Sequence, residues 1–95
     1  MGQLVRSKAG RDTGKAFLIV ALVDSEYVLV ADGDSRLMAK PKRKNIKHLI
    51  IQRHVACSIK LKLVDGKLPS DREIKAALQE LLTMGENTGI NVERG

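Results

Sequence analysis

The chain has 95 residues, 43% of them hydrophobic, and a formal net charge of +6 at pH 7. These values predict one small globular domain and argue against a wholly disordered chain. No apolar run is long enough to cross a bilayer, and the single cysteine excludes an internal disulfide. The first six residues fit neither a signal peptide nor a myristoylation site, so we expect a cytoplasmic protein without membrane contact.

The positive charge is concentrated in one segment. Residues 1–38 carry five basic and five acidic side chains, and residues 55–95 carry six of each. Residues 39–54 carry six basic side chains and no acidic one. An excess that is focused in this way indicates a polyanionic partner more strongly than an evenly spread one.

The first half predicts short antiparallel strands separated by turns. Gly10 and Gly14 bracket a polar loop where positive φ is expected, and residues 32–35 form a turn. The run 15–23 is nearly all apolar and predicts a strand buried on both faces, while Pro41 belongs at an edge or in a loop. The expected strands are 3–7, 15–23, 27–31, 36–40 and 46–51. Strands of this length and spacing favour a small closed or partly open antiparallel β-barrel over residues 1–52.

The second half predicts a C-terminal extension, residues 53–95, that contains a helix. Ser70 and Glu73 have the spacing of a capping box, and a helix over about 71–84 should end before Gly85. Its apolar stripe consists of Ile74, Ala77, Leu78, Leu81 and Leu82. Residues 57–66 fit either a strand or a helix that ends at Gly66, and residues 86–95 are expected to be a loose tail. The fold class is therefore mainly β with an α extension.

Residues 5–33, "VRSKAGRDTGKAFLIVALVDSEYVLVADG", resemble a KOW motif, with Gly14 as its fixed glycine. The continuation "RLMAKPKRKNIKHL" is similar to the large-subunit ribosomal proteins of the "fourteen-e" group and their small bacterial relatives. The resemblance covers roughly residues 2–50, and "SDREIKAAL" adds a loose likeness to the bacterial relatives. It implies an SH3-like barrel that binds structured RNA, above all ribosomal RNA.

Two groups of basic residues are candidates for phosphate contacts, because clustered cations release the counterions condensed on RNA. The first surrounds Pro41 and continues into the next strand: Lys40, Lys42, Arg43, Lys44, Lys47 and His48. The second flanks the glycine loop, whose N–H groups could also reach a phosphate: Arg6, Lys8, Arg11 and Lys15. The plainer alternatives are a solvated basic face for the first group and ion pairs with Asp12 and the acids of the strands for the second.

Aromatic residues are nearly absent. Phe17 lies inside the apolar run and should be core, and core packing is also favoured for Tyr27. We therefore expect RNA to be recognised by its shape and phosphates and not by stacking on bases. His48, His54 and Cys57 are too few for a structural zinc site, and no pattern indicates a catalytic residue, a metal or a cofactor.

These observations predict a non-catalytic, monomeric RNA-binding protein of the translation machinery. Its partners would be structured RNA, foremost ribosomal RNA, and the ribosome or ribosomal proteins. The alternative is a protein-interaction module of ribosome- or transcription-associated machinery, in which the stripe of the 71–84 helix would be the interface. Nuclear import through the basic run ranks last, because strands are expected on both sides of it.

Overall fold

The computed structural model describes residues 1–94, and the side chains of residues 1–83. Five strands come first and two helices follow. The strands are β1 (Gln3–Ser7), β2 (Ala16–Leu22), β3 (Tyr27–Ala31), β4 (Lys42–Asn45) and β5 (Leu49–Val55), with a 3-10 turn η1 (Ile46–His48) before β5. The helices are α1 (Cys57–Val64) and α2 (Asp71–Arg94). The expected fold class, mainly β with an α extension, is confirmed.

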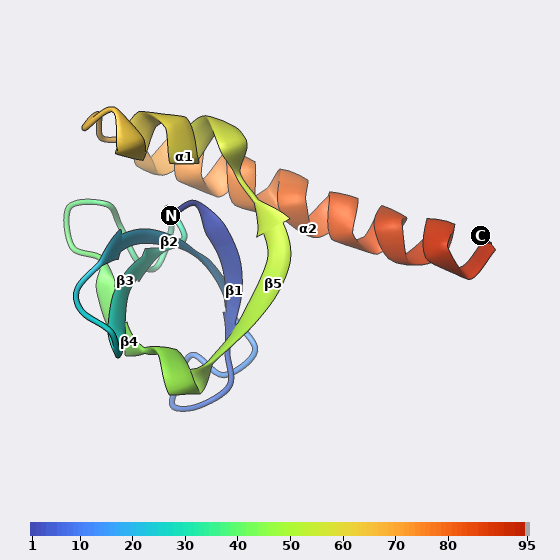
Figure 1. Ribbon diagram of the computed structural model, residues 1–95, viewed down its shortest axis with the longest axis horizontal. Coiled ribbons are helices and arrows are strands. Elements are labelled where there is room, and N and C mark those ends of the chain that lie inside the picture. Colours follow the sequence, from blue (N-terminus) through green and yellow to red (C-terminus); the bar gives the residue numbers. More distant parts are fainter. Residues whose placement is uncertain (95) are drawn as a thin grey trace.

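The strands form one antiparallel sheet in the order β4-β3-β2-β1-β5, which rolls into a rounded shape (Figure 1). The register shifts at two places: β2 has an extra residue between Ile19 and Ala21 opposite β3, and β5 has extra residues between Ile51 and Val55 opposite β1. Such bulges bend a strand and increase its twist. Within residues 1–94 no hydrogen-bonded ladder joins β4 to β5, so the curved sheet is open between these two strands. β5 crosses the domain boundary that we expected between residues 52 and 53.

Each face of the sheet packs a separate apolar cluster, because successive side chains of a strand point to opposite faces. One cluster fills the inside of the curved sheet: Val5, Phe17, Ile19, Val28, Val30 and Leu49. The other lies between the sheet and the two helices: Leu4, Leu18, Val20, Ala31, Ala56, Ile59, Ile74, Leu78 and Leu81. β2 contributes to both clusters, which confirms that its apolar run is a strand buried on both faces.

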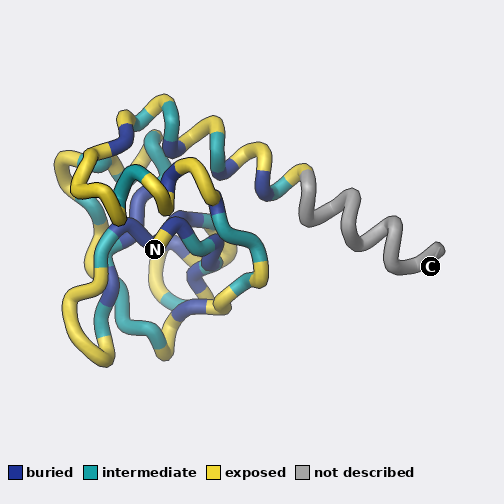
Figure 2. The backbone as a smooth tube through the Cα atoms, turned by 45° about the horizontal axis from the view of Figure 1, so that its top comes forward, coloured by how far each residue is buried: buried dark blue, intermediate teal, exposed yellow. Residues whose placement is uncertain are grey.

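The two helices lie across one end of the sheet, opposite η1 and the loop between β1 and β2 (Figure 1). The N–H of Glu73 donates to Ser70 Oγ at 3.1 Å and the N–H of Ser70 donates to Glu73 Oε1 at 3.0 Å, which confirms the capping box. The predicted apolar stripe of α2 packs against the sheet, and the buried segments gather where the two meet (Figure 2). The N–H of Met38 donates to Asp71 Oδ1 at 2.7 Å, and a Cβ added at Gly33 would overlap the backbone of Asp71, so the β3–β4 loop also abuts α2.

The expected strand over residues 36–40 is wrong. Residues 35–40 form turns and bends, and the fourth strand is the basic segment Lys42–Asn45 itself. It pairs with β3 from Val30 opposite Lys42 to Tyr27 opposite Asn45. An edge strand needs few apolar side chains of its own, because its partner strand supplies the buried surface. Pro41 lies directly before this edge strand, as its missing N–H requires.

Residues 57–64 form α1, so of the two alternatives for this segment the helix is correct, and Gly66 follows it with a φ of +77°. The predicted end of the second helix is wrong, since α2 continues through Gly85 to Arg94. The loose tail expected over 86–95 is likewise wrong for residues 86–94, and Gly95 lies outside the described residues. A glycine inside a helix costs only about 1 kcal/mol relative to alanine, which does not suffice to end it. Among residues 1–94 no helix is both long and apolar enough to cross a bilayer.

Candidate nucleic-acid interface

A hollow of about 380 Å³ lies at the β4 edge of the sheet and brings the glycine loop and the basic segment together. Its walls come from the β1–β2 loop, the start of β3, β4 and η1. The lining residues are Ala9, Gly10, Tyr27, Lys42, Arg43, Lys44, Asn45 and His48. Among these described residues there is no carboxylate, so the hollow presents cations, hydrogen-bond donors and one aromatic ring. We call it the β4 hollow.

Backbone hydrogen bonds hold the glycine loop beside η1. The N–H of Lys8 donates to the carbonyl of His48 at 2.9 Å, and the N–H of Gly14 donates to the carbonyl of Ser7 at 2.7 Å. Gly10 and Gly14 have φ values of +78° and +87°, which confirms the positive φ expected for both. A segment near residue 10 and one near residue 48, distant in sequence, thereby form adjoining walls of one hollow.

Asp12 is buried in the glycine loop and gathers three cations around its carboxylate. Arg36 Nη2 lies 3.2 Å and Lys44 Nζ 3.4 Å from Oδ2, and Lys15 Nζ lies 3.9 Å from Oδ1. Burial alone raises the pKa of Asp12, but the hydrogen bond and charge of Arg36 and the charge of Lys44 outweigh it, so the pKa is lowered. Asp12 therefore remains ionised and connects the glycine loop to the β3–β4 loop and to β4.

The three basic side chains of β4 differ in their surroundings. Lys44 has a side chain only 11% exposed, and its Nζ donates to Ser7 Oγ at 3.3 Å besides pairing with Asp12. Lys42 and Arg43 are exposed on the same strand. Alternation along the strand accounts for part of this difference, because Lys44 is paired with the buried Val28 and Arg43 with Leu29. Lys44 thus stabilises the fold of the site, while Lys42 and Arg43 present their charge to solvent.

Arg43 stacks on Tyr27. The guanidinium carbon lies 4.2 Å from the centroid of the ring. Tyr27 is half-buried and lines the hollow. The core position that we favoured for it is therefore wrong, and its ring lies at the surface of the site. Phe17 is fully buried, as expected.

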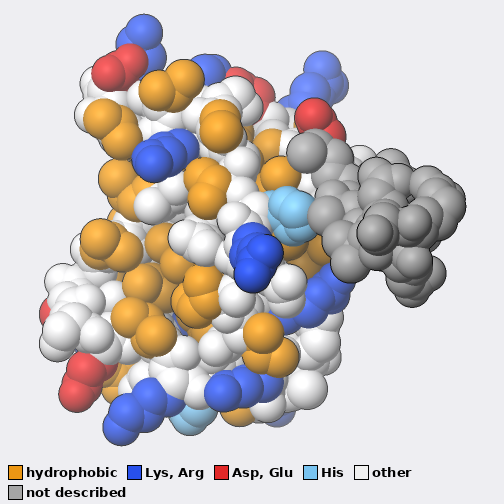
Figure 3. Space-filling view, turned by 45° about the vertical axis from the view of Figure 1, so that its right-hand side comes forward, with side chains coloured by type: hydrophobic (Ala, Val, Ile, Leu, Met, Phe, Trp, Pro, Cys, Tyr) orange, Lys and Arg blue, Asp and Glu red, His pale blue; other side chains and the backbone are white. Residues whose placement is uncertain are grey.

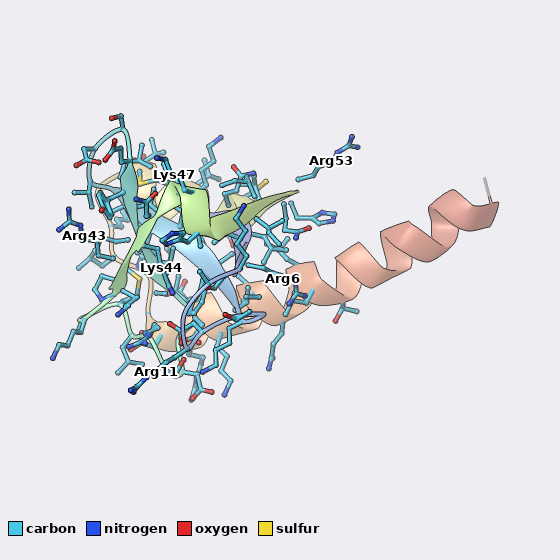
Figure 4. The ribbon with its side chains drawn as sticks, turned by 90° about the horizontal axis from the view of Figure 1, so that it is seen from below. Arg6, Arg11, Arg43, Lys44, Lys47 and Arg53 are labelled. Atoms are coloured by element: carbon cyan, nitrogen blue, oxygen red, sulfur yellow. The ribbon has the colours of Figure 1, made fainter. Side chains whose placement is uncertain are left out.

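Of the remaining predicted residues, His48 lines the β4 hollow and the others do not. Lys40 lines an adjacent hollow with Arg36, Pro41 and Lys42. Lys8, Arg11, Lys47 and His48 are exposed. Arg43, Lys44, Lys47 and Arg11 lie toward the left of the molecule in Figure 4, whereas Arg53 projects on its right.

Arg6 and Lys15 belong to a different part of the surface. They line a hollow beside α2, together with Asp32 and Lys75. Arg6 Nη1 also donates to the carbonyl of Gly14 at 3.0 Å, so this guanidinium supports the glycine loop. The second basic group of the sequence is therefore divided, with Lys8 and Arg11 beside the β4 hollow and Arg6 and Lys15 elsewhere.

Sequence reasoning undervalued Asp12 and Tyr27 and did not identify Asn45. For Asp12 a signal existed, since it is the one acid inside the basic glycine loop. Tyr27 and Asn45 carry no such signal, because only the pairing of β3 with β4 places them in the hollow. No family model matches the sequence.

Proposed function

We propose that the protein is a non-catalytic RNA-binding protein of the KOW type, with an SH3-like barrel, that acts in the translation machinery. It binds structured RNA, ribosomal RNA above all, through phosphate contacts in and around the β4 hollow. The observation that carries this proposal is the convergence of the glycine loop and the basic segment on one hollow without a carboxylate in its described lining.

The charges of this surface fit a polyanion. Lys40, Lys42, Arg43 and Lys47 are exposed, and the neighbouring Lys8 and Arg11 extend the same field. Asp12 of the glycine loop is buried and is paired with three cations. Neutralising phosphates releases counterions, so a surface of this kind binds RNA with a strong dependence on salt.

The rounded sheet supports the second part of the proposal. Five short antiparallel strands, with an extra residue in β2 opposite β3 and extra residues in β5 opposite β1, are compatible with an SH3-like barrel. The helices cover the end away from η1 and the glycine loop, so the proposed RNA surface is not covered by α1 or α2 (Figure 1). The rigid edge strand would hold its cations at fixed spacing, as the regular backbone of a folded RNA requires.

Basic residues on an edge strand have a second use that needs no RNA. Lysine and proline at an edge discourage pairing with the sheet of another molecule. RNA binding and protection of the edge strand predict different results. Protection of the edge requires neither affinity for RNA nor a salt-dependent association with it.

The protein-interaction alternative is weakened by one observation and supported by another. The stripe of α2 that would have formed the interface is buried against the sheet. Ile50 and Ile51 on the edge strand β5, however, are 48% and 49% exposed. Figure 3, which brings β5 forward, shows hydrophobic side chains gathered on this face. Solution mass tests this candidate, since self-association through β5 would give a dimer that Ile51→Lys dissociates.

The RNA-binding proposal is tested by crosslinking the protein to RNA in a cell extract and sequencing the attached RNA. We expect ribosomal RNA to be enriched over its share in the extract. The variant with Lys40, Lys42 and Lys47 changed to alanine should recover much less RNA. Recovery that is equally low for both proteins, or without enrichment of ribosomal RNA, would favour the protein-interaction candidate.

A further inference from the structure

The cation–π pair of Arg43 and Tyr27 is built into the sheet. Tyr27 is paired with Asn45 across β3 and β4, and Arg43 is two residues from Asn45 on the same strand. The two side chains are therefore diagonal neighbours on one face, a relationship within reach of aromatic and long side chains. Their observed separation of 4.2 Å agrees with this geometry.

The start of β3 is fixed in place as well. Asp24 Oδ1 accepts hydrogen bonds from the N–H of Glu26 at 2.8 Å and from the N–H of Tyr27 at 2.9 Å. These two backbone hydrogen bonds, together with the charge of Arg43, hold the pKa of Asp24 below its ordinary value. Tyr27 is thus the first residue of β3, and the turn before it is held by two hydrogen bonds. Its ring contacts one side of the Arg43 guanidinium, and Arg43 is exposed to solvent.

We propose that the Arg43–Tyr27 pair is a stacking platform for one unpaired nucleobase of the bound RNA. This inference rests on the proposed RNA-binding function and adds to its phosphate contacts one stacked base, which departs from the expectation from the sequence that bases are not stacked. The preferred target would be a folded RNA with an unpaired nucleotide next to its duplex, with the duplex phosphates on the lysines and the unpaired base on the platform.

The chemistry of the platform supports a base as its ligand. A guanidinium is planar and weakly hydrated, so it stacks on an aromatic face on one side and on a nucleobase on the other. Lysine has the same charge but no plane, and it cannot take this role. Asn45 and His48 line the same hollow and offer hydrogen-bonding groups near the edge of a stacked base.

Two RNA hairpins of the same stem sequence test the inference, one fully paired and one with a single bulged nucleotide. The wild-type protein should bind the bulged hairpin more tightly, by about 5-fold or more, the contribution of one stacked base. Arg43→Lys keeps the charge and should bring the two dissociation constants to within about 2-fold of each other. Lys42→Ala, the control on the same strand, should weaken both hairpins by the same factor.

Tyr27 offers a direct readout, because it is the only tyrosine of the chain. Its ring proton resonances should shift on addition of the bulged hairpin and move much less with the paired one. Arg43→Lys should reduce the shift for the bulged hairpin.

Three outcomes would overturn the inference. Equal binding of both hairpins by the wild-type protein would do so, and so would an unchanged preference in Arg43→Lys. In either case salt-dependent binding of both hairpins would leave the proposed RNA-binding function standing. Absence of binding to both hairpins would overturn that function together with the platform.

Discussion

Lys44 Nζ lies 3.4 Å from Asp12 Oδ2, and this ion pair ties the edge strand β4 to the glycine loop. Both side chains are largely buried, and Ser7 Oγ accepts a further hydrogen bond from the same ammonium. One of the cations in the basic run is therefore part of the architecture of the site. The charge available to a polyanion is that of its exposed neighbours.

A comparison of Lys44→Ala with Lys42→Ala tests whether Lys44 stabilises the fold while Lys42 does not. The two lysines lie two residues apart on one strand, and each substitution removes one positive charge. We expect Lys44→Ala to lower the free energy of unfolding by about 1–3 kcal/mol, because it removes one partner of a buried carboxylate. Lys42→Ala should change it by less than about 0.5 kcal/mol, as is usual for exposed positions. Urea unfolding measures both, and equal decreases would contradict the assignment.

The lowered pKa of Asp12 predicts a pH-dependent contribution to stability. A carboxyl whose pKa is lower in the folded state than its ordinary value of 3.8 binds fewer protons there than in the unfolded state. Its stabilising effect is thus complete above the ordinary value and is lost as the pH falls through the lowered folded value. The wild type should have a larger free energy of unfolding than Asp12→Asn at pH 7. The difference between the two free energies should decrease on acidification below about pH 4. Denaturant unfolding over a pH series measures this difference, and a difference in free energy of unfolding that stays constant with pH would contradict the prediction.

Gly33 is expected to be the least replaceable glycine of the described chain. Its φ is +76°, and a Cβ at this position would lie 2.2 Å from the carbonyl oxygen of Asp71 and 2.8 Å from the nitrogen of Lys75. Gly33→Ala would therefore force the β3–β4 loop away from α2. We expect a decrease of about 2–4 kcal/mol in the free energy of unfolding, from backbone strain together with overpacking.

Gly66→Ala is the matched control for Gly33. Gly66 has a φ of +77°, but a Cβ there would meet no atom within 4 Å. Only the strain of the backbone remains, about 1 kcal/mol. If thermal unfolding gave the same decrease in stability for both substitutions, the packing of the β3–β4 loop on α2 would not contribute to stability.

Much of the fold could be predicted from local sequence, because the signals were local. β1 and β3 have the expected bounds, and β2 is shorter by one residue at each end, since each is marked by its own apolar residues and turns. The capping box at Ser70 was recognisable for the same reason. β4 was missed because it is a strand only through its pairing with β3 and has no apolar residue of its own. The end of α2 was missed because a single glycine is a weak stop.

The positions of the charged residues of the site could be predicted from the sequence, but the contacts between its side chains could not. The sequence showed where the cations are, but the burial of Lys44 depends on Asp12, which lies 32 residues earlier in the chain. The stacking of Arg43 on Tyr27 likewise depends on the pairing of β3 with β4. Such relationships arise from strand register and loop packing, so residue type and spacing alone do not reveal them.

The most direct test of the account is the salt dependence of binding to one structured RNA, measured for two charge-matched variants. In the first, Lys40, Lys42 and Lys47 at the proposed interface become alanine; in the second, the exposed Lys60, Lys67 and Lys75 of the helical region do. We predict that the first variant binds more weakly and that its log–log salt slope shrinks by roughly 0.7–0.9 for each phosphate that the protein no longer neutralises. The second should keep a slope close to that of the wild type. Equal slopes for the two variants would contradict the placement of RNA at the β4 hollow.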